Sequence, residues 1–181
     1  MSRSALETFI AAVRPVWGEL SSELVRACRK ELEQLLQASA SEPWLAALQA
    51  EAPASRELYR DPDHGFVLQA HIEPAGTFRP PHDHGRSWVI YGVQQGEIEM
   101  STYARIASPD GQVRLVERDK TLVCAGQVQV YLPGDIHATR ALKESARLFR
   151  FSERDLKAED KQHGRVTRYV CQDGFWTVGA Q

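Results

Sequence analysis

The chain has 181 residues, a formal net charge of −2 and 43% hydrophobic residues. This length suits one domain, or one domain with a helical extension, and the composition excludes a disordered chain. No block of Lys and Arg indicates nucleic acid or an anionic membrane as a partner, so we expect a small-molecule substrate.

Three scattered cysteines, Cys28, Cys124 and Cys171, do not indicate a disulfide framework. No apolar run approaches the roughly 18 residues of a membrane span. The N-terminal residues lack the apolar stretch and cleavage site of a signal peptide. These features together predict a cytoplasmic protein with no membrane partner.

The first part of the chain is expected to be helical. Ser4 and Glu7 form a capping-box pattern for a helix over 4–14, which Pro15 ends. A second helix is expected from Ser21 or Ser22, with an apolar face that runs to Leu36, and a third over about 43–50. We interpret residues 1–52 as a helical extension packed on a barrel formed by 53–181, with one structural domain overall.

From Pro53 onward, β-branched and aromatic segments recur every eight to twelve residues with turn residues between them. The predicted strands are 66–73, 87–94, 97–104, 112–118, 121–124, 127–132, 137–142, 146–152, 165–171 and 174–178. A hairpin turn is predicted at Ser108-Pro109-Asp110-Gly111. Many short strands without intervening helices predict a mainly β fold, a barrel or double-sheet jelly roll.

Three histidines are the candidate metal ligands. His82 and His84 lie two residues apart in Pro-Pro-His-Asp-His-Gly, and His137 follows in Leu-Pro-Gly-Asp-Ile-His. Side chains two apart in an extended chain point the same way, so both imidazoles can converge on one ion. Imidazole suits iron(II), zinc, copper and nickel, so the ligands alone do not select the metal. The alternative is a set of structural histidines.

These two stretches resemble the two cupin motifs, G(x)5HxH(x)3–4E(x)6G and G(x)5PxG(x)2H(x)3N. The matching residues are Gly76, His82, His84 and Gly96 in the first and Gly126, Gly134 and His137 in the second. Val89 stands where most cupins place a glutamate ligand, which leaves three histidines. This combination is similar to the cysteine dioxygenase (thiol dioxygenase) family of bacterial type. The resemblance implies a cupin (RmlC-like jelly-roll) β-barrel and Fe(2+), with Zn, Ni or another divalent metal as alternatives.

The resemblance also implies where a substrate binds. Arg60 occupies the place of the arginine that pairs with the substrate carboxylate, with a surface arginine as the alternative and Arg79 as a rival candidate. Phe149 and Phe151 stand where the family carries the histidine and tyrosine of a Ser-His-Tyr relay. We therefore expect the relay to be missing and these two rings to form an apolar pocket wall.

Other groups could form the polar wall. Alternation places Gln69, His71 and Glu73 on one face of their strand, so His71 is a candidate catalytic proton handler. Its alternative is an exposed or supporting histidine. Tyr91 shares a face with Val89 and is a candidate substrate contact, or else a core tyrosine with a satisfied hydroxyl.

The sequence thus predicts an enzyme that oxidises a small thiol carboxylate, such as cysteine or 3-mercaptopropionate, to its sulfinate with O2. The alternatives are a three-His metal cupin that acts on a non-thiol substrate and a non-catalytic ligand-binding cupin. The expected partners are the substrate and O2, and a homodimer is the candidate assembly because exposed barrel faces often dimerise.

Overall fold

The computed structural model describes residues 3–107 and 111–179. Its helices are α1 (Ala5–Val13), α2 (Ser22–Leu35), α3 (Pro43–Glu51) and α4 (Leu156–His163), with a 3-10 turn at Arg14–Val16. Its strands are β1 (Arg56–Arg60), β2 (Val67–Glu73), β3 (Phe78–His82), β4 (Val89–Gln95), β5 (Glu97–Ala107), β6 (Val113–Cys124), β7 (Val128–Tyr131), β8 (Ile136–Ala141), β9 (Ala146–Ser152), β10 (Tyr169–Gln172) and β11 (Phe175–Val178).

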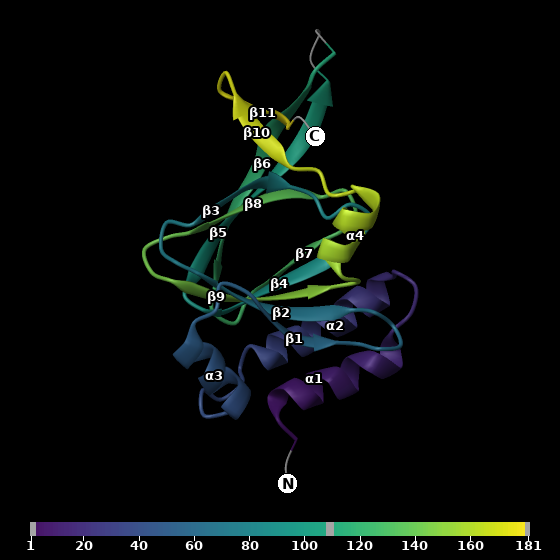
Figure 1. The fold of residues 1–181 in the computed structure, drawn as a ribbon, viewed down its shortest axis with the longest axis vertical. Coiled ribbons are helices and arrows are strands. Elements are labelled where there is room, and N and C mark those ends of the chain that lie inside the picture. The colour runs from purple at the N-terminus through teal and green to yellow at the C-terminus, as the bar shows by residue number, and fades with distance from the viewer. Residues whose placement is uncertain (1–2, 108–110, 180–181) are drawn as a thin grey trace.

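The strands form two facing sheets that make a nearly closed barrel (Figure 1). One sheet has the order β1-β2-β9-β4-β7, and the other has the order β10-β11-β6-β5-β8-β3. All strand pairs run antiparallel. The predicted mainly β, jelly-roll type of fold with N-terminal helices is confirmed.

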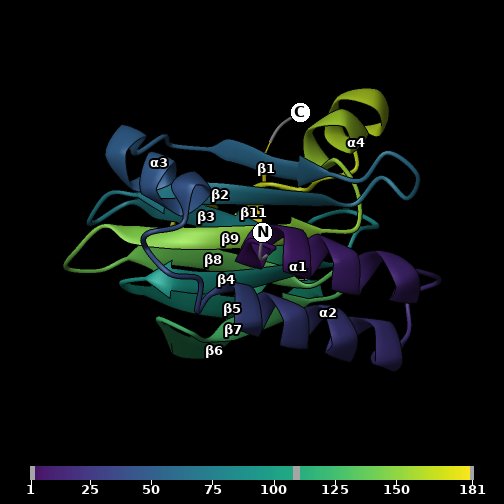
Figure 2. The same ribbon diagram turned by 90° about the horizontal axis from the view of Figure 1, so that it is seen from below.

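Helices α1, α2 and α3 cover the outer face of the first sheet (Figure 2). The capping box predicted for α1 is present, with Ser4 and Glu7 bonded to each other's backbone. The hydrophobic core between helices and sheet includes buried side chains from both, such as Phe9 and Leu32 from the helices and Leu68 and Ile90 from the strands. Burial of this apolar face holds the extension on the barrel.

Close packing of α2 depends on a glycine in the sheet. Gly92 lies on β4, and a Cβ there would meet the Leu36 side chain at 3.0 Å. Its cross-strand partner is Phe149, which belongs to the same outer core. The absence of a side chain on β4 thus leaves room for the end of α2.

Side chains of strand β9 alternate between the core beneath the helices and the barrel interior. Phe149 and Phe151 are fully buried in the core beneath the helices, where Phe151 meets Phe9 edge-on with ring centroids 5.5 Å apart. Because side chains alternate along a strand, Leu148 and Arg150 face the barrel interior instead. The expectation that Phe149 and Phe151 line the pocket is therefore wrong.

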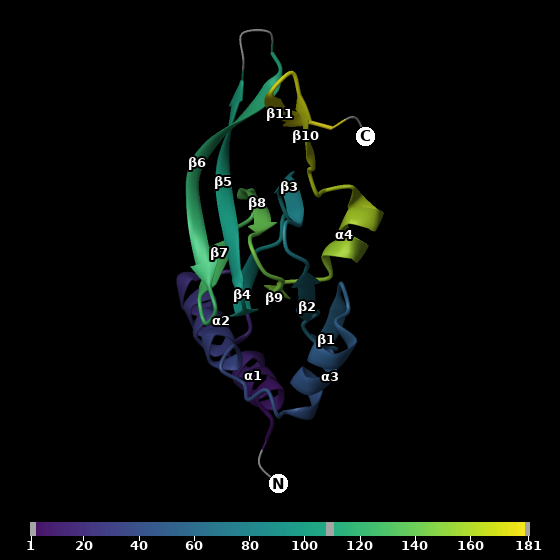
Figure 3. The ribbon, with the colours of Figure 1, turned by 90° about the vertical axis from the view of Figure 1, so that its left-hand side faces the viewer.

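Most predicted strands are present, and the differences have clear causes. Strands β1 and β3 were not predicted, because their segments are rich in charged residues and proline. The predicted segments 112–118 and 121–124 form one strand, β6, which pairs along β5 in a long hairpin that Figure 3 shows in side view. The hairpin turn predicted at 108–111 has its first three residues outside the described residues.

Helix α4 was missed because it buries only Leu156 and Glu159, which is too little for an apolar period to show. Its end signals were nevertheless in the sequence: Asp155 caps the N-terminus, and Gly164 ends the helix with a left-handed backbone. Within residues 3–107 and 111–179, no helix is long and apolar enough to cross a membrane.

Candidate metal centre

The three predicted histidines come together at one end of the barrel. His82 is the last residue of β3 and pairs across the sheet with His137 of β8, while His84 follows in the next turn. One ring nitrogen from each lies within 4.8 Å of the others. His137 is fully buried and His84 is 3% exposed. The sequence-predicted cluster is therefore present in the structure.

The spacing of the nitrogens suits a single metal ion. The Nε2 atoms of His84 and His137 lie 3.4 Å apart. Metal–nitrogen bonds of about 2.0–2.1 Å place two ligand nitrogens on one ion roughly 2.9–3.4 Å apart. This pair already has the required separation, and a ring nitrogen of His82 lies within 4.8 Å of both.

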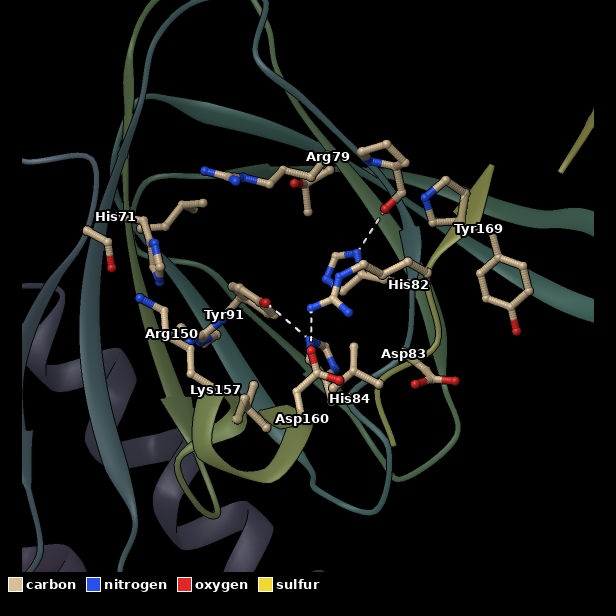
Figure 4. Close-up of a pocket in the computed structure, with 18 of the residues that line it drawn as sticks. His71, Arg79, His82, Asp83, His84, Tyr91, Arg150, Lys157, Asp160 and Tyr169 are labelled. Atoms are coloured by element: carbon tan, nitrogen blue, oxygen red, sulfur yellow. Dashed lines mark hydrogen bonds and ion pairs between the residues drawn. The ribbon is translucent and has the colours of Figure 1, made fainter. Parts of the chain in front are cut away.

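The protonation of the rings also suits a metal. His82 donates through Nδ1 to the carbonyl oxygen of Pro80 at 2.8 Å, because that oxygen can only accept, so its Nε2 keeps a free lone pair (Figure 4). Burial lowers the pKa of His82, lowers that of His84 to about 2, and holds that of His137 well below its ordinary value. All three imidazoles are thus neutral at pH 7, as a metal requires.

Packing, rather than hydrogen bonding, orients two of the ligands. Among the described residues, the buried Nδ1 atoms of His84 and His137 have no hydrogen-bond partner. The ring of Tyr131 lies against His137 with centroids 4.0 Å apart. Supporting hydrogen bonds to ligating histidines usually strengthen metal affinity by about 10–100-fold, so a metal ion at this site would depend on packing contacts such as that of Tyr131 instead.

Asp83, between two ligands, fixes the turn that carries them. Its buried carboxylate accepts hydrogen bonds from the backbone N–H groups of Gly85 and Thr167, and from Arg105 at 3.2 Å. Gly85 has a φ of +63°, which favours glycine, and a Cβ there would meet the Arg165 carbonyl oxygen at 3.0 Å. The turn thereby binds the segment before β10 against the metal centre.

Tyr91 and Arg150 lie beside the histidines. The Tyr91 hydroxyl and His84 Nε2 share a hydrogen bond of 3.2 Å, and Tyr91 is 6% exposed. Burial raises the pKa of Tyr91, while a hydrogen bond and the charge of Arg150 oppose that rise. The lone pair that Tyr91 contacts is the one a metal would take, so this hydroxyl lies next to the metal position.

His82 and His84 line a cavity of about 880 Å³ whose wall also includes Tyr91, Leu148 and Arg150, and His137 lies buried behind them. This volume is typical of small-molecule sites. Strands β2, β3, β4 and β9 supply one part of the wall, and α4 and β10 supply another. Figure 4 shows Tyr91 between the histidines and a second group formed by His71, Arg150 and Lys157.

His71 lines this cavity, as the alternation on its strand predicted. Burial is the largest cause that lowers its pKa to about 3, followed by the charges of Arg150, Arg79 and Lys157. Its ring forms a hydrogen bond with the backbone of Ala54, and its buried Nε2 has no hydrogen-bond partner among the described residues. The ring is therefore a neutral imidazole with one free nitrogen.

The structure does not bring Arg60 to the site. Arg60 lies on β1, its side chain is 43% exposed, and it pairs with Glu57 at 2.6 Å and Asp155 at 2.9 Å. The prediction of Arg60 as a substrate contact is therefore wrong, and the surface interpretation holds. The rival, Arg79, does line the cavity but pairs with Glu73 at 2.8 Å.

Arg150 is the residue that sequence reasoning missed. It donates to Gln69, a neutral side chain, and no carboxylate of the described residues pairs with it. The signal was available: the N-terminal helices need an apolar sheet face, which assigns Phe149 and Phe151 outward and Arg150 inward. Counting residues from His137 instead assigned Phe149 and Phe151 to the pocket, and this count selected the wrong face of the strand.

Comparisons with known proteins were made at three levels. No protein-family model and no curated protein matches this chain. Among solved structures, the Schizosaccharomyces pombe Cnp3 cupin domain aligns with 61% of this chain and 66% of its own, just under two thirds, at 19% identity and TM-score 0.45. KdgF from Halomonas sp. aligns over 57% and 82%, at 21% identity and TM-score 0.45.

A cupin 2 conserved barrel domain protein from Leptotrichia buccalis aligns with 54% of this chain and 38% of its own, at 20% identity and TM-score 0.40. Cupin-domain proteins are thus among the structures to which this chain is similar. These distant likenesses do not bear on function, and the barrel is defined by its own strand order.

Proposed function

We propose that this protein is a non-haem iron(II) dioxygenase of the thiol dioxygenase type that acts on a small anionic thiol. The observation that carries the proposal is the convergence of three neutral imidazoles beside a cation that no carboxylate of the described residues neutralises. The ring nitrogens lie within 4.8 Å of one another, and among the described residues Arg150 has Gln69 and Tyr91 as its polar partners.

His82, His84 and His137 would hold the metal. Their three nitrogens leave the opposite side of an ion open to ligands, and iron(II) bound there supplies the reactivity toward O2 and the affinity for a thiolate. Addition of both oxygen atoms of O2 to a thiolate gives a sulfinate of the same charge. The overall reaction therefore needs no external reductant and no net proton transfer.

Arg150 would hold the carboxylate of the substrate. A guanidinium fork matches a carboxylate in two parallel hydrogen bonds, and a charged hydrogen bond contributes about 1.5–3 kcal/mol. The Gln69 amide that now accepts from Arg150 orients the guanidinium without neutralising it. Arg150 thus takes the role that the sequence assigned to Arg60.

Tyr91 would donate a hydrogen bond to a group bound on the metal. Its hydroxyl now shares a hydrogen bond with His84 Nε2, and a metal on that nitrogen would release the hydroxyl. The raised pKa of Tyr91 keeps the hydroxyl protonated at neutral pH, so it remains a donor. Tyr91 therefore supplies one polar group near the metal position, whereas the sequence has Phe149 and Phe151 in place of the histidine and tyrosine of the expected relay.

A second candidate function keeps the metal and changes the substrate. A cavity of about 880 Å³ is large for a thiol acid of seven or so heavy atoms, since volumes of roughly 300–1,000 Å³ serve drug-sized ligands. This observation favours a three-His oxygenase that acts on a larger, non-thiol anion. The wall is basic, however, rather than the apolar surface expected from Phe149 and Phe151.

The test is oxygen uptake and product analysis with iron-loaded protein and a panel of 3-mercaptopropionate, cysteine and thiol-free acids. We expect oxygen consumption and one sulfinate formed per O2 with at least one thiol. Protein in which His137→Ala has removed a ligand is the matched control. Iron-loaded protein that turns over no thiol in the panel would refute the proposal, and turnover of a thiol-free acid would favour the second candidate.

A further inference from the structure

The cavity carries more positive charge than its own carboxylates neutralise. Three carboxylates line it, and each is already paired with an arginine: Glu73 with Arg79, Asp83 with Arg105, and Asp160 with Arg168. Three lining cations, Arg150, Lys157 and Lys161, have no carboxylate partner among the described residues. A substrate with one carboxylate neutralises only one of them.

The unpaired cations come from two opposing walls. Arg150 lies on β9, in the sheet, while Lys157 and Lys161 lie four residues apart on α4 and therefore on one side of that helix. Figure 4 shows Lys157 on the same side of the cavity as His71 and Arg150, away from His82. The charges of Arg150, Arg79 and Lys157 all contribute to the lowered pKa of His71.

This end of the cavity also has an unused polar atom. His71 lines the cavity, and its buried Nε2 has no partner among the described residues. Because the other ring nitrogen donates to the Ala54 backbone, this Nε2 carries a lone pair and accepts, so a ligand that completes the site brings a hydrogen-bond donor to it beside its anionic group.

We propose that Lys157 and Lys161 bind a second anionic group of the substrate, so that the site takes a small organic acid with two anionic groups, called a dianion below. The second group is a carboxylate or a phosphate held between α4 and the His71–Arg150 wall, and the cavity volume leaves room for it. The inference rests on the proposed function in one respect, that Arg150 binds the first anionic group.

The test compares matched ligands that differ by one anionic group. Calorimetric titrations use zinc-loaded protein with succinate against propionate, and phosphoglycolate against glycolate, so that turnover plays no part. The wild type is compared with the double variant Lys157→Gln/Lys161→Gln. A second double variant, Lys30→Gln/Lys143→Gln, removes two exposed lysines that do not line the cavity and has the same net charge.

We expect at least one dianion to bind roughly tenfold more tightly than its monoanion partner to the wild type and to the control variant. The α4 variant should lose most of this preference while it keeps its affinity for the monoanion. Preference for succinate identifies a dicarboxylate, and preference for phosphoglycolate identifies a phosphate-bearing acid. The preference should also weaken with added salt, because the lysines are exposed.

Equal affinity of the wild type for both members of each pair would overturn the inference, and so would an undiminished preference in the α4 variant. These outcomes are separate from those of the proposed function. Turnover of 3-mercaptopropionate without any dianion preference would contradict only the second-anion site. A dianion preference in iron-loaded protein that oxidises no thiol would contradict only the thiol dioxygenase assignment.

Discussion

The two faces of the first sheet have opposite chemistry although the same strands supply both. On the outer face, Phe149 and Phe151 of β9 pack in an apolar core beneath α1 and α2. On the inner face, Arg150 lies beside Tyr91 and the metal-site histidines. The helices pack on one face, and Arg150, the polar side chain of β9 that lines the cavity, points to the other.

This comparison separates stability from function along one strand. The outer residues should affect the free energy of unfolding and leave ligand binding unchanged in folded molecules. The inner residues should affect ligand binding and change stability little, because partly buried polar groups contribute less to folding than packed aromatic rings.

The largest expected effect is at the outer face. Phe151→Ala removes a fully buried ring that contacts the rings of Phe9, Trp17, Phe66 and Trp88. We expect the free energy of unfolding to fall by about 3–5 kcal/mol in urea denaturation. The milder Phe151→Leu variant should fold, with a smaller loss, and should bind metal as the wild type does.

A Phe151→Leu protein that is folded but has lost its metal or its ligand affinity would contradict the assignment of this residue to the outer face. The same result would restore the sequence-based expectation that Phe151 lines the pocket.

The second largest expected effect is a loss of ligand affinity at the inner face of the sheet. Arg150→Gln should weaken binding of a carboxylate ligand by roughly 10–100-fold, since a charged hydrogen-bonded pair is lost from a sheltered site. Propionate affinity measured on zinc-loaded protein provides the readout, with urea denaturation to show that folding is intact. Arg60→Gln, an exposed cation outside the cavity, is the matched control and should bind propionate normally.

If Arg60→Gln weakened binding and Arg150→Gln did not, the roles assigned to the two arginines would have to be exchanged.

The smallest effect concerns His71 and pH. Its pKa in the folded protein is about 3, against 6.5 for the ordinary side chain. Between these values the unfolded chain binds a proton that the folded chain does not, so the free energy of unfolding rises with pH. The stability that His71 contributes is therefore lost progressively as the pH falls below about 6.5. Protein without metal should therefore lose stability between pH 6 and pH 5, and His71→Gln should lose less by about 1 kcal/mol.

His163→Gln is the control for this measurement, because His163 is exposed at the end of α4. The same pH dependence in wild type and His71→Gln protein would show that His71 is not the buried neutral ring described above.

Local patterns predicted much of the fold and the metal centre. Ser4 and Glu7 mark the first helix, alternation marks most strands, and His82 and His84 two apart in an extended segment can be recognised without any tertiary information. His137 joins them because β8 pairs with β3, a contact that the motif resemblance indicated and that spacing alone does not.

The rest depended on tertiary packing. The face of β9 that meets the pocket is decided by α1 and α2, which are more than a hundred residues away in sequence. Arg60 had a suitable position in the sequence, but β1 lies at the edge of its sheet and turns that side chain toward Glu57 and Asp155. Helix α4 carries charge into the cavity but buries too little apolar surface to be predicted from periodicity.

The central claim is that His82, His84 and His137 bind one metal ion. Crystals grown or soaked anaerobically with iron(II) should give an anomalous difference peak at the iron absorption edge, bonded to one nitrogen of each ring. A His84→Ala crystal treated in the same way should give no peak there. Absence of a peak in the wild type, a peak elsewhere, or full occupancy in the variant would contradict the assignment.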